Sequence, residues 1–333
     1  MDYIFGPVQS RRLGRSLGID LFSKKICNLN CVYCEVGPTL SPMCRRSAYS
    51  PVRLICEEID EWRADPRRLA SADVLTVTAK GEPTLHSGLG EILAHLKVEA
   101  DKPVAVLTNG TTLTDETVRR DLMAADLVVP SFDAARSEGF ARVDRPAAHL
   151  ELAAIIDGLA IFSREFSGKI WLEILLVRGM NDASEDIAAL VTAIRRMRID
   201  RIQLNTVVRP PAEAWACPVS RERLSAVAGQ LHRELGLPVD LPFAAQATRA
   251  AEAAMADPAM LAALGDDIVH MVQRRPCTAV DIDRTFHLGG PEKVEQLLDS
   301  LIRAGILHRQ THDGAWYYQA AWRGRGVDPC EPV

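Results

Sequence analysis

Short apolar runs alternate with amphipathic segments through the first two thirds of the chain, and this alternation limits the possible folds more than any other feature. Strands are expected at 17–22, 74–79, 104–108, 126–131, 170–177 and 201–208. Helical patterns are expected at 50–64, 87–99, 114–125, 147–165, 184–197 and 220–235. Nearly continuous apolar strands that are separated by helices indicate a parallel sheet with both faces covered. We therefore expect an α/β fold, and six such units in a row favour a partial (β/α)6 barrel over a flat doubly wound sheet.

The pattern changes after the last of these strands, where a Pro-rich loop leads into an Ala-rich stretch. Helical patterns then follow at 265–275, 278–286 and 291–305. A two-strand pattern surrounds Asp313 and Gly314, a pair that is typical of a type I′ turn. Three helices and a hairpin predict a small winged-helix domain. The expected parts are a barrel at 1–240, a helical linker at 241–264 and a winged-helix domain at 265–333.

The third helix of such a domain normally enters a DNA groove, so its charge bears on the partner. In this helix the acidic side chains outnumber the basic ones; they are Glu292, Glu295 and Asp299 against Lys293 and Arg303. Because phosphates dominate affinity for DNA, this pattern disfavours DNA as a partner. Docking of a peptide, protein, RNA or substrate, or purely structural capping, remains open.

Overall charge and hydropathy exclude other classes. The 333 residues carry a formal charge of −5 and a pI near 5.9, which gives no general attraction to nucleic acid. The N-terminus has no basic segment followed by an apolar one, as a secretory signal would. The longest apolar run, 170–177, is interrupted by Glu173 and is too short to cross a bilayer. We expect a cytoplasmic protein with no membrane association.

Three of the eight cysteines, Cys27, Cys31 and Cys34, form a C-x3-C-x2-C run. Such a trio is a disulfide with a spare thiol, half of a metal site, or a metal site with one position left open. In a reducing compartment, closely spaced thiols are more often metal ligands or redox groups than disulfides. The other cysteines are scattered and are interpreted as ordinary thiols, with Cys44 the least certain of them.

A four-iron cluster explains why there are three thiols. Thiolates on all four irons give a closed electron carrier, whereas three thiolates leave one iron with a vacant position. A vacancy suits a ligand that is chelated and then reduced by one electron. A structural zinc site needs a fourth ligand, and none of the scattered cysteines offers a second pair.

The trio, with the aromatic Tyr33 before Cys34, resembles the signature of radical S-adenosylmethionine (radical SAM) enzymes. Further motifs follow in the order of that family, namely "KGEPT" at 80–84, "TNG" at 108–110 and "SFDA" at 131–134. The resemblance implies that the three cysteines hold a [4Fe–4S] cluster whose open iron binds S-adenosylmethionine (SAM). It also implies that reduction cleaves SAM to methionine and a 5′-deoxyadenosyl radical, which abstracts hydrogen from a substrate.

The same resemblance assigns cofactor contacts to Tyr33 and to the turns after three strands. The turn residues are Gly81, Glu82 and Pro83, then Thr108 and Asn109, then Ser131 and Asp133. Glu82 is expected to accept a hydrogen bond from the methionine ammonium. The later turns stand where relatives contact the ribose or the methionine carboxylate. Without the resemblance, Asn109 and Asp133 could also be residues that only stabilise turns.

Polar residues in and beside the last two strands are further candidates. Glu173 lies within an apolar strand, so it should face the barrel interior or pair with a basic group. Asn205 has a similar place in the next strand, and both are candidates for cofactor or substrate contact. Arg209 could hold an anionic substrate group or form a salt bridge. Lys80 is a substrate contact or a surface lysine.

Several stretches resemble one branch of the family, the wybutosine-synthesis enzymes that act on tRNA. They include "CEVGPT" at 34–39, "GEPTLH" at 81–86 and "LVRGMND" at 176–182. Those enzymes hold a second cluster on three cysteines upstream of the signature, whereas no cysteine precedes Cys27 in this chain. This departure and the acidic charge weaken tRNA base modification as a function.

We therefore expect an oxidoreductase of radical SAM type that acts on a peptide, a protein, a small molecule or RNA. A flavodoxin- or ferredoxin-type reductase would supply the electron. The alternatives are an iron–sulfur sensor that binds nucleic acid through the winged helix, and a zinc scaffold. No side chain is assigned a catalytic role.

Overall fold

The computed structural model describes residues 2–10, 13–98, 102–242, 265, 267–286 and 288–320. The chain divides into two compact units, 1–250 and 251–333. The predicted helical linker lies outside the described residues from 243 onward, and the predicted domain boundaries stay predictions. Among the described residues, no helix combines the length and the apolar character that a bilayer-spanning helix needs.

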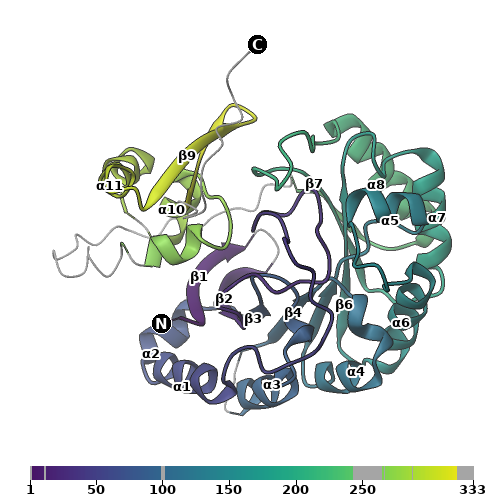
Figure 1. Ribbon diagram of the computed structural model, residues 1–333, viewed down its shortest axis with the longest axis horizontal. Coiled ribbons are helices and arrows are strands. Elements are labelled where there is room, and N and C mark those ends of the chain that lie inside the picture. Colours follow the sequence, from purple (N-terminus) through teal and green to yellow (C-terminus); the bar gives the residue numbers. More distant parts are fainter. Residues whose placement is uncertain are drawn as a thin grey trace. The chain divides into compact units, whose positions relative to one another are not determined.

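Eight strands form the sheet of the first unit, in the order of the sequence (Figure 1). They are β1 (Ile4–Ser10), β2 (Gly14–Asp20), β3 (Val74–Thr78), β4 (Val104–Thr108), β5 (Leu127–Pro130), β6 (Lys169–Leu176), β7 (Arg201–Thr206) and β8 (Val239–Asp240). β1 pairs with β2 antiparallel, and all later neighbours are parallel. The predicted parallel α/β sheet is confirmed, with the six expected strands as β2 to β7.

Helices follow most of these strands and line the outer side of the curved sheet in Figure 1. They are α1 (Val52–Arg63), α2 (Pro66–Ser71), α3 (Leu89–Lys97), α4 (Glu116–Leu122), α5 (Ser137–Val143), α6 (Leu152–Glu165), α7 (Ser184–Ile194) and α8 (Arg221–Leu235). Two short 3₁₀ turns, Pro83–Leu85 and Thr111–Thr114, come directly after β3 and β4. The six helices expected from the sequence correspond to α1, α3, α4, α6, α7 and α8.

Both faces of β3, β4 and β5 are buried, which accounts for their continuous apolar runs. Successive strand residues point to opposite faces. Leu75 and Val77 of β3 belong to the large core that includes helix residues such as Ile92. Val74 points the other way and packs with Leu127 and other inner-face residues in a separate cluster. These three strands therefore lack the polar alternation of a sheet with one solvated face. By contrast, β6 and β7 carry polar residues beside apolar ones, namely Glu173, Gln203 and Asn205.

Besides the two 3₁₀ turns, two strands and two α-helices of the described residues in the first unit were not expected from the sequence. β1 contains a Gly-Pro pair and its register shifts between Phe5 and Val8, which interrupts the strand pattern. β8 has only two residues. α2 and α5 have six and seven residues, too few for an apolar period of 3.6 to stand out.

The described residues of the second unit include two helices that follow one another and then a hairpin. α10 (Ala279–Phe286) and α11 (Pro291–Arg303) precede β9 (Leu307–His312) and β10 (Ala315–Ala320), which pair antiparallel. The turn residues Asp313 and Gly314 both have positive φ, at 46° and 74°, as a type I′ turn requires. Residues 267–272 are also helical. The hairpin is confirmed at its predicted place.

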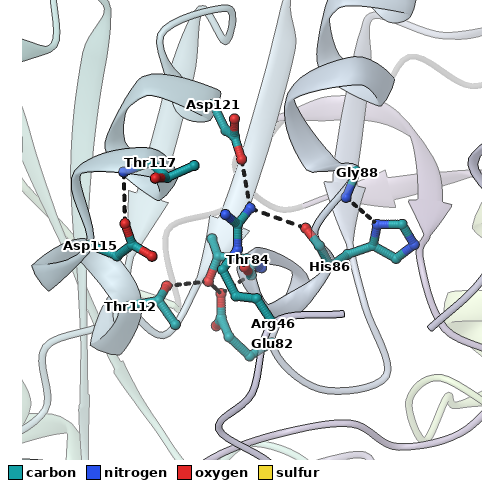
Figure 2. A network of polar contacts seen from close by, with 9 residues as sticks. All are labelled: Arg46, Glu82, Thr84, His86, Gly88, Thr112, Asp115, Thr117 and Asp121. Atoms are coloured by element: carbon teal, nitrogen blue, oxygen red, sulfur yellow. Dashed lines mark hydrogen bonds and ion pairs between the residues drawn. The ribbon is translucent and has the colours of Figure 1, made fainter. Parts of the chain in front are cut away.

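His86 is a fully buried histidine in the turn region after β3. Its Nδ1 accepts a hydrogen bond from Gly88 N at 3.0 Å (Figure 2), and its Nε2 lies 2.9 Å from Ser50 O. A ring that accepts at one nitrogen and donates at the other is neutral. Burial lowers the pKa of His86, and the positive charge of Arg46 acts in the same direction, against the hydrogen bond to Ser50.

We expect His86 to reduce the stability of the fold at acid pH. The imidazole has a pKa of about 6.5 in the unfolded state and a lower pKa in the folded state. As the pH falls below 6.5, the unfolded state therefore binds a proton that the folded state excludes. The free energy of unfolding should fall between pH 7 and pH 5 more steeply in the wild type than in His86→Gln, which cannot titrate. Urea unfolding at several pH values measures both slopes, and equal slopes would contradict the prediction.

Candidate functional site

The three cysteines lie on the loop between β2 and α1, and backbone hydrogen bonds fix this loop on two sides. On one side it pairs with the turn after β3, where Glu82 N donates to Ile26 O at 2.8 Å. On the other side Val32 N donates to Val143 O, at the end of α5, at 2.9 Å. Cys27 and Cys31 therefore lie between two anchored residues, and Cys34 follows the second of them by two residues.

The three thiols are free, and the described part of the chain contains no disulfide. Burial raises the pKa of Cys27 to about 12, and the positive charge of Lys25 acts weakly in the opposite direction. Burial also raises the pKa of Cys31, and the carboxyl group of Asp144 adds to this shift. Metal binding to such thiols displaces their protons, so the metal supplies the positive charge that the site lacks.

The donor set fits an iron–sulfur cluster. Within the described residues, no three His, Cys, Asp or Glu side chains are placed as ligands of one metal ion. A four-iron cluster does not need such convergence, because each thiolate binds a different iron. Three free thiols at 27, 31 and 34, on one loop anchored at residues 26 and 32, are the ligands that three corners of the cluster require.

Glu82 joins the turn after β3 to the turn after β4. Its fully buried carboxylate accepts hydrogen bonds at Oε1 from Thr84 N (3.0 Å) and from Thr108 Oγ1 (2.6 Å). At Oε2 it accepts one from Asn109 N (2.5 Å). Burial raises the pKa of Glu82, and these hydrogen bonds oppose the rise. The predicted residues of the two turns thus form one network.

Arg46 forms polar contacts with the turn after β3 and with α4 (Figure 2). Its Nε donates to Thr84 O at 2.9 Å, and its NH2 group forms an ion pair with Asp121 of α4 at 2.6 Å. The same group lies 3.3 Å from His86 O. Both charged side chains are largely buried, so the pair links the segment after the cysteines, the turn after β3 and α4. The sequence analysis missed this role of Arg46.

Asn109 and Asn28 connect the turn after β4 to the cysteine loop. Asn109 Nδ2 donates to Asn28 Oδ1 at 2.8 Å and lies 3.8 Å from Cys27 Sγ. Asn28 Nδ2 donates to Thr111 Oγ1 at 2.7 Å. Asn28 is buried and was not among the predicted residues. Its place directly after Cys27 is the only signal that the sequence offers.

A second network surrounds Tyr33 and Asp133. The Tyr33 hydroxyl donates to Asp133, whose other oxygen accepts a hydrogen bond from Leu175 N at 2.7 Å. Burial raises the pKa of Asp133 to about 7. Asp144, also buried, lies with its Oδ1 3.8 Å from Cys31 Sγ. The predicted Tyr33 and Asp133 are brought together, whereas Asp144 was missed because no motif marks it.

Three more predicted residues lie directly after β5 (Ser131), on β6 (Glu173) and on β7 (Asn205). Ser131 pairs with Glu173 as a parallel bridge, and Asn205 Nδ2 donates to Glu173 Oε1. Gln203 stands opposite Glu173 in the register and was not predicted. It is buried, and neither of its amide atoms has a hydrogen-bond partner among the described residues. A ligand or a water molecule is therefore needed to satisfy this amide.

Two further candidate residues, Arg209 and Lys80, form ion pairs. Arg209 lies 3.2 Å from Glu35, directly after the third cysteine, so it forms the salt bridge that was one of its two expected roles. Lys80 is also mostly buried, and its Nζ lies 3.9 Å from Asp20. It is therefore a paired lysine and not a solvated one.

The chain is similar in sequence to one protein superfamily and to several individual proteins. A sequence model of the Radical SAM superfamily matches residues 23–191, about half of the chain. A UPF0026 protein of Helicobacter pylori (strain J99) is 32% identical over 301 residues, which are 89% of this chain and 92% of that protein. The GTPase Obg of Brachyspira hyodysenteriae is 29% identical over 315 residues, which are 95% of this chain. The chain spans only 45% of that longer relative.

Among solved structures, TYW1 with a lysine-pyruvate adduct bound is similar at a TM-score of 0.50 and 16% identity. The match covers 66% of this chain and 73% of that one. At this identity the likeness shows the fold alone. The resemblance that the motifs indicate is confirmed by the superfamily match.

Replacement of Gly81 by alanine should separate the cysteine loop from the turn after β3. Gly81 has a φ of +136°, and a Cβ atom there would lie 1.8 Å from Ile26 O. We expect Gly81→Ala to lower the free energy of unfolding by at least about 3 kcal/mol, from backbone strain and lost hydrogen bonds. It should also reduce the iron bound after anaerobic reconstitution.

Gly179→Ala is the matched control for this variant. Gly179 also has a positive φ, +72°, but nothing lies within 4 Å of an added Cβ. Gly179→Ala should therefore lower the free energy of unfolding through backbone strain alone, by about 1–2 kcal/mol. Urea unfolding and iron analysis compare the two variants, and equal losses in both would show that the contact with Ile26 is unimportant.

Proposed function

The chain belongs to the radical SAM superfamily, and from this premise we propose an enzyme that cleaves SAM reductively and directs the resulting radical to a substrate. Its cofactors are a [4Fe–4S] cluster and SAM. In this proposal Cys27, Cys31 and Cys34 hold the cluster. When bound, the cluster supplies the electron that breaks the sulfonium C–S bond, which yields methionine and a 5′-deoxyadenosyl radical that abstracts hydrogen.

The hydrogen-bonded connection between Cys27 and Glu82 carries the proposal. Asn109 is the link, since its amide lies 3.8 Å from Cys27 Sγ while its backbone N–H donates to Glu82. A ligand chelated beside Cys27 would therefore lie close to a buried carboxylate. Such proximity is what a cofactor with a cationic amino group requires.

Glu82 is proposed to bind the methionine ammonium. Its Oε1 already accepts from Thr84 and Thr108, but its Oε2 accepts from Asn109 N, and a carboxylate oxygen has room for a second donor. The backbone bonds hold the carboxylate in one position before the ligand arrives. An ammonium at this place would also offset the cost of burying the negative charge.

The second network is proposed to bind the other end of SAM. Tyr33 directly precedes Cys34 and donates to Asp133, so the turn after β5 is joined to the loop beside the third thiol. Ser131 of the same turn pairs with Glu173. We assign to these residues the ribose and carboxylate contacts, for which their hydroxyl and carboxyl groups are suited.

Glu173, Asn205 and the unpredicted Gln203 are proposed to face the substrate or SAM. The unpartnered amide of Gln203 supports this assignment, because a buried polar group without a hydrogen bond costs about 1–3 kcal/mol. A ligand that bonds to it would recover that cost. The substrate class stays open among peptides, proteins, small molecules and RNA.

Modification of a tRNA base is the second candidate function, because the stretches at 34–39, 81–86 and 176–182 resemble those of the wybutosine-synthesis enzymes. The chain has no cysteine before Cys27 to hold the second cluster of the wybutosine-synthesis enzymes. Its charge of −5 also opposes binding to a polyanion. We therefore favour a substrate other than tRNA.

The second unit is proposed to be a winged-helix domain that docks a peptide, a protein or RNA. In α11 the acidic Glu292, Glu295 and Asp299 are exposed, which disfavours a DNA-binding sensor. Superfamily members need a reductant, and we propose a flavodoxin- or ferredoxin-type protein for this role. Lys24 and Arg45, two exposed basic residues near the cysteines in the sequence, suit an acidic partner of that kind.

Anaerobic reconstitution with iron and sulfide, followed by reduction with dithionite and addition of SAM, should yield 5′-deoxyadenosine. Cys31→Ala should reduce the yield to background because one corner of the cluster loses its ligand. Cys56→Ala is the control, since Cys56 lies on α1 outside the cysteine loop, and it should keep the yield. Chromatography of the nucleoside products measures this.

Three outcomes would contradict the proposal. Full cleavage by Cys31→Ala would remove that residue from the ligand set. A cluster that forms but never cleaves SAM would favour the sensor. Zinc in place of iron would favour the scaffold.

Glu82→Gln should weaken SAM binding without loss of iron. A hydrogen bond to a charged group contributes about 1.5–3 kcal/mol, so the dissociation constant should rise roughly 10- to 100-fold. Glu213→Gln, which removes a carboxylate paired with Arg145, is the control and should bind SAM as the wild type does. Equilibrium dialysis with labelled SAM measures both, and an unchanged constant for Glu82→Gln would refute the role of Glu82.

A further inference from the structure

Lys25 contacts a cluster ligand through its side chain. Its Nζ lies 3.1 Å from Cys34 Sγ and also donates to Gly37 O. The side chain therefore spans the cysteine loop from before the first thiol to beyond the third. It is partly buried, whereas the neighbouring Lys24 is exposed.

We propose that Lys25 raises the reduction potential of the cluster. Its ammonium donates an N–H···S hydrogen bond to Cys34 and thereby favours one-electron reduction. The inference rests on the proposed function, since it assumes that Cys34 is a ligand. Reduction adds one electron from the reductant to the cluster and makes it more negative. A fixed positive charge and an N–H···S bond stabilise the reduced form more than the oxidised form.

The neighbouring carboxylates do not cancel the effect of Lys25 on Cys34. The carboxylate nearest to Cys34 in the sequence is Glu35, and it is paired with Arg209 at 3.2 Å. The other nearby carboxyl groups lie beside other thiols, with Asp144 3.8 Å from Cys31. Among the described residues, no ion pair between Lys25 and a carboxylate is found. Its charge therefore acts on the thiolate without a competing anion in contact.

Partial burial strengthens the interaction. The energy between two charges rises as the effective dielectric constant falls, and salt screens a partly buried pair less than an exposed one. Lys24 carries the same charge on the adjacent residue but is exposed to solvent. Its influence on the cluster should therefore be small, which makes it the natural comparison.

The test is the midpoint potential of the reconstituted full-length protein. Lys25→Met removes the charge and the donor while it keeps the length of the side chain. We expect its equilibrium constant for one-electron reduction to fall at least about tenfold, which corresponds to a potential lower by roughly 59 mV. Lys24→Met should keep the wild-type potential. A redox titration followed by visible absorption and by the EPR signal of the reduced cluster measures both.

Two further variants keep the test decisive if Lys25→Met binds little iron. Lys25→Arg keeps the charge and should stay near the wild-type potential, whereas Lys25→Gln keeps a donor but loses the charge and should be lower. A wild-type potential in iron-loaded Lys25→Met or Lys25→Gln would overturn the inference. An equal shift in Lys24→Met would do the same, because it would show a general effect of surface charge.

The titration requires no SAM cleavage, so its result is separate from that of the proposed function. A wild-type protein that holds a cluster but forms no 5′-deoxyadenosine would refute the proposed function and leave the Lys25 effect measurable. A protein that cleaves SAM with the same potential in all iron-loaded variants would refute only the role of Lys25.

Discussion

The backbone pairing of Ile26 with the turn around Gly81 is the interaction on which the site depends. Ile26 forms a parallel bridge with Gly81, and its carbonyl accepts from Glu82 N. The cysteine loop thereby continues the sheet for one residue, and Cys27 comes next. An added Cβ at Gly81 would occupy the place of the Ile26 carbonyl. The glycine of the "GEP" motif is thus required by the close approach of the cysteine loop, whatever it also does for a cofactor.

The central part of the fold could be predicted because burial on both faces leaves a readable pattern. β3 to β5 are short and apolar, β6 and β7 keep apolar residues at alternate positions, and helices separate most of these strands. Strands and helices that lack such a pattern were not predicted. β1 is interrupted by Gly6 and Pro7, and β8 has two residues. α2 and α5 are too short to show a helical period. Such elements depend on neighbours that the local sequence does not reveal.

The site shows the same division between local and distant information. Glu82, Thr108 and Asn109 could be named because motifs mark the ends of β3 and β4, and parallel strands bring these ends to one edge. Asn28 and Asp144 could not, because their partners are distant in the sequence. Thr111 is 83 residues from Asn28, and Asp144 is 113 residues from Cys31. Only the folded chain reveals such pairs.

The site also gathers more acid than base, which bears on the kind of ligand it accepts. Glu82, Asp133 and Asp144 are buried beside three thiols, and burial raises the pKa of each carboxyl group. Negative charge is therefore costly there until a cation compensates it. In the proposed function, iron would provide such charge at the thiolates, and SAM would bring an ammonium and a sulfonium. Lys25 is the basic side chain that contacts a thiol of the trio in the described chain, so most of the compensation must come from bound groups. The buried carboxyl groups and thiols of this site therefore favour positively charged ligands.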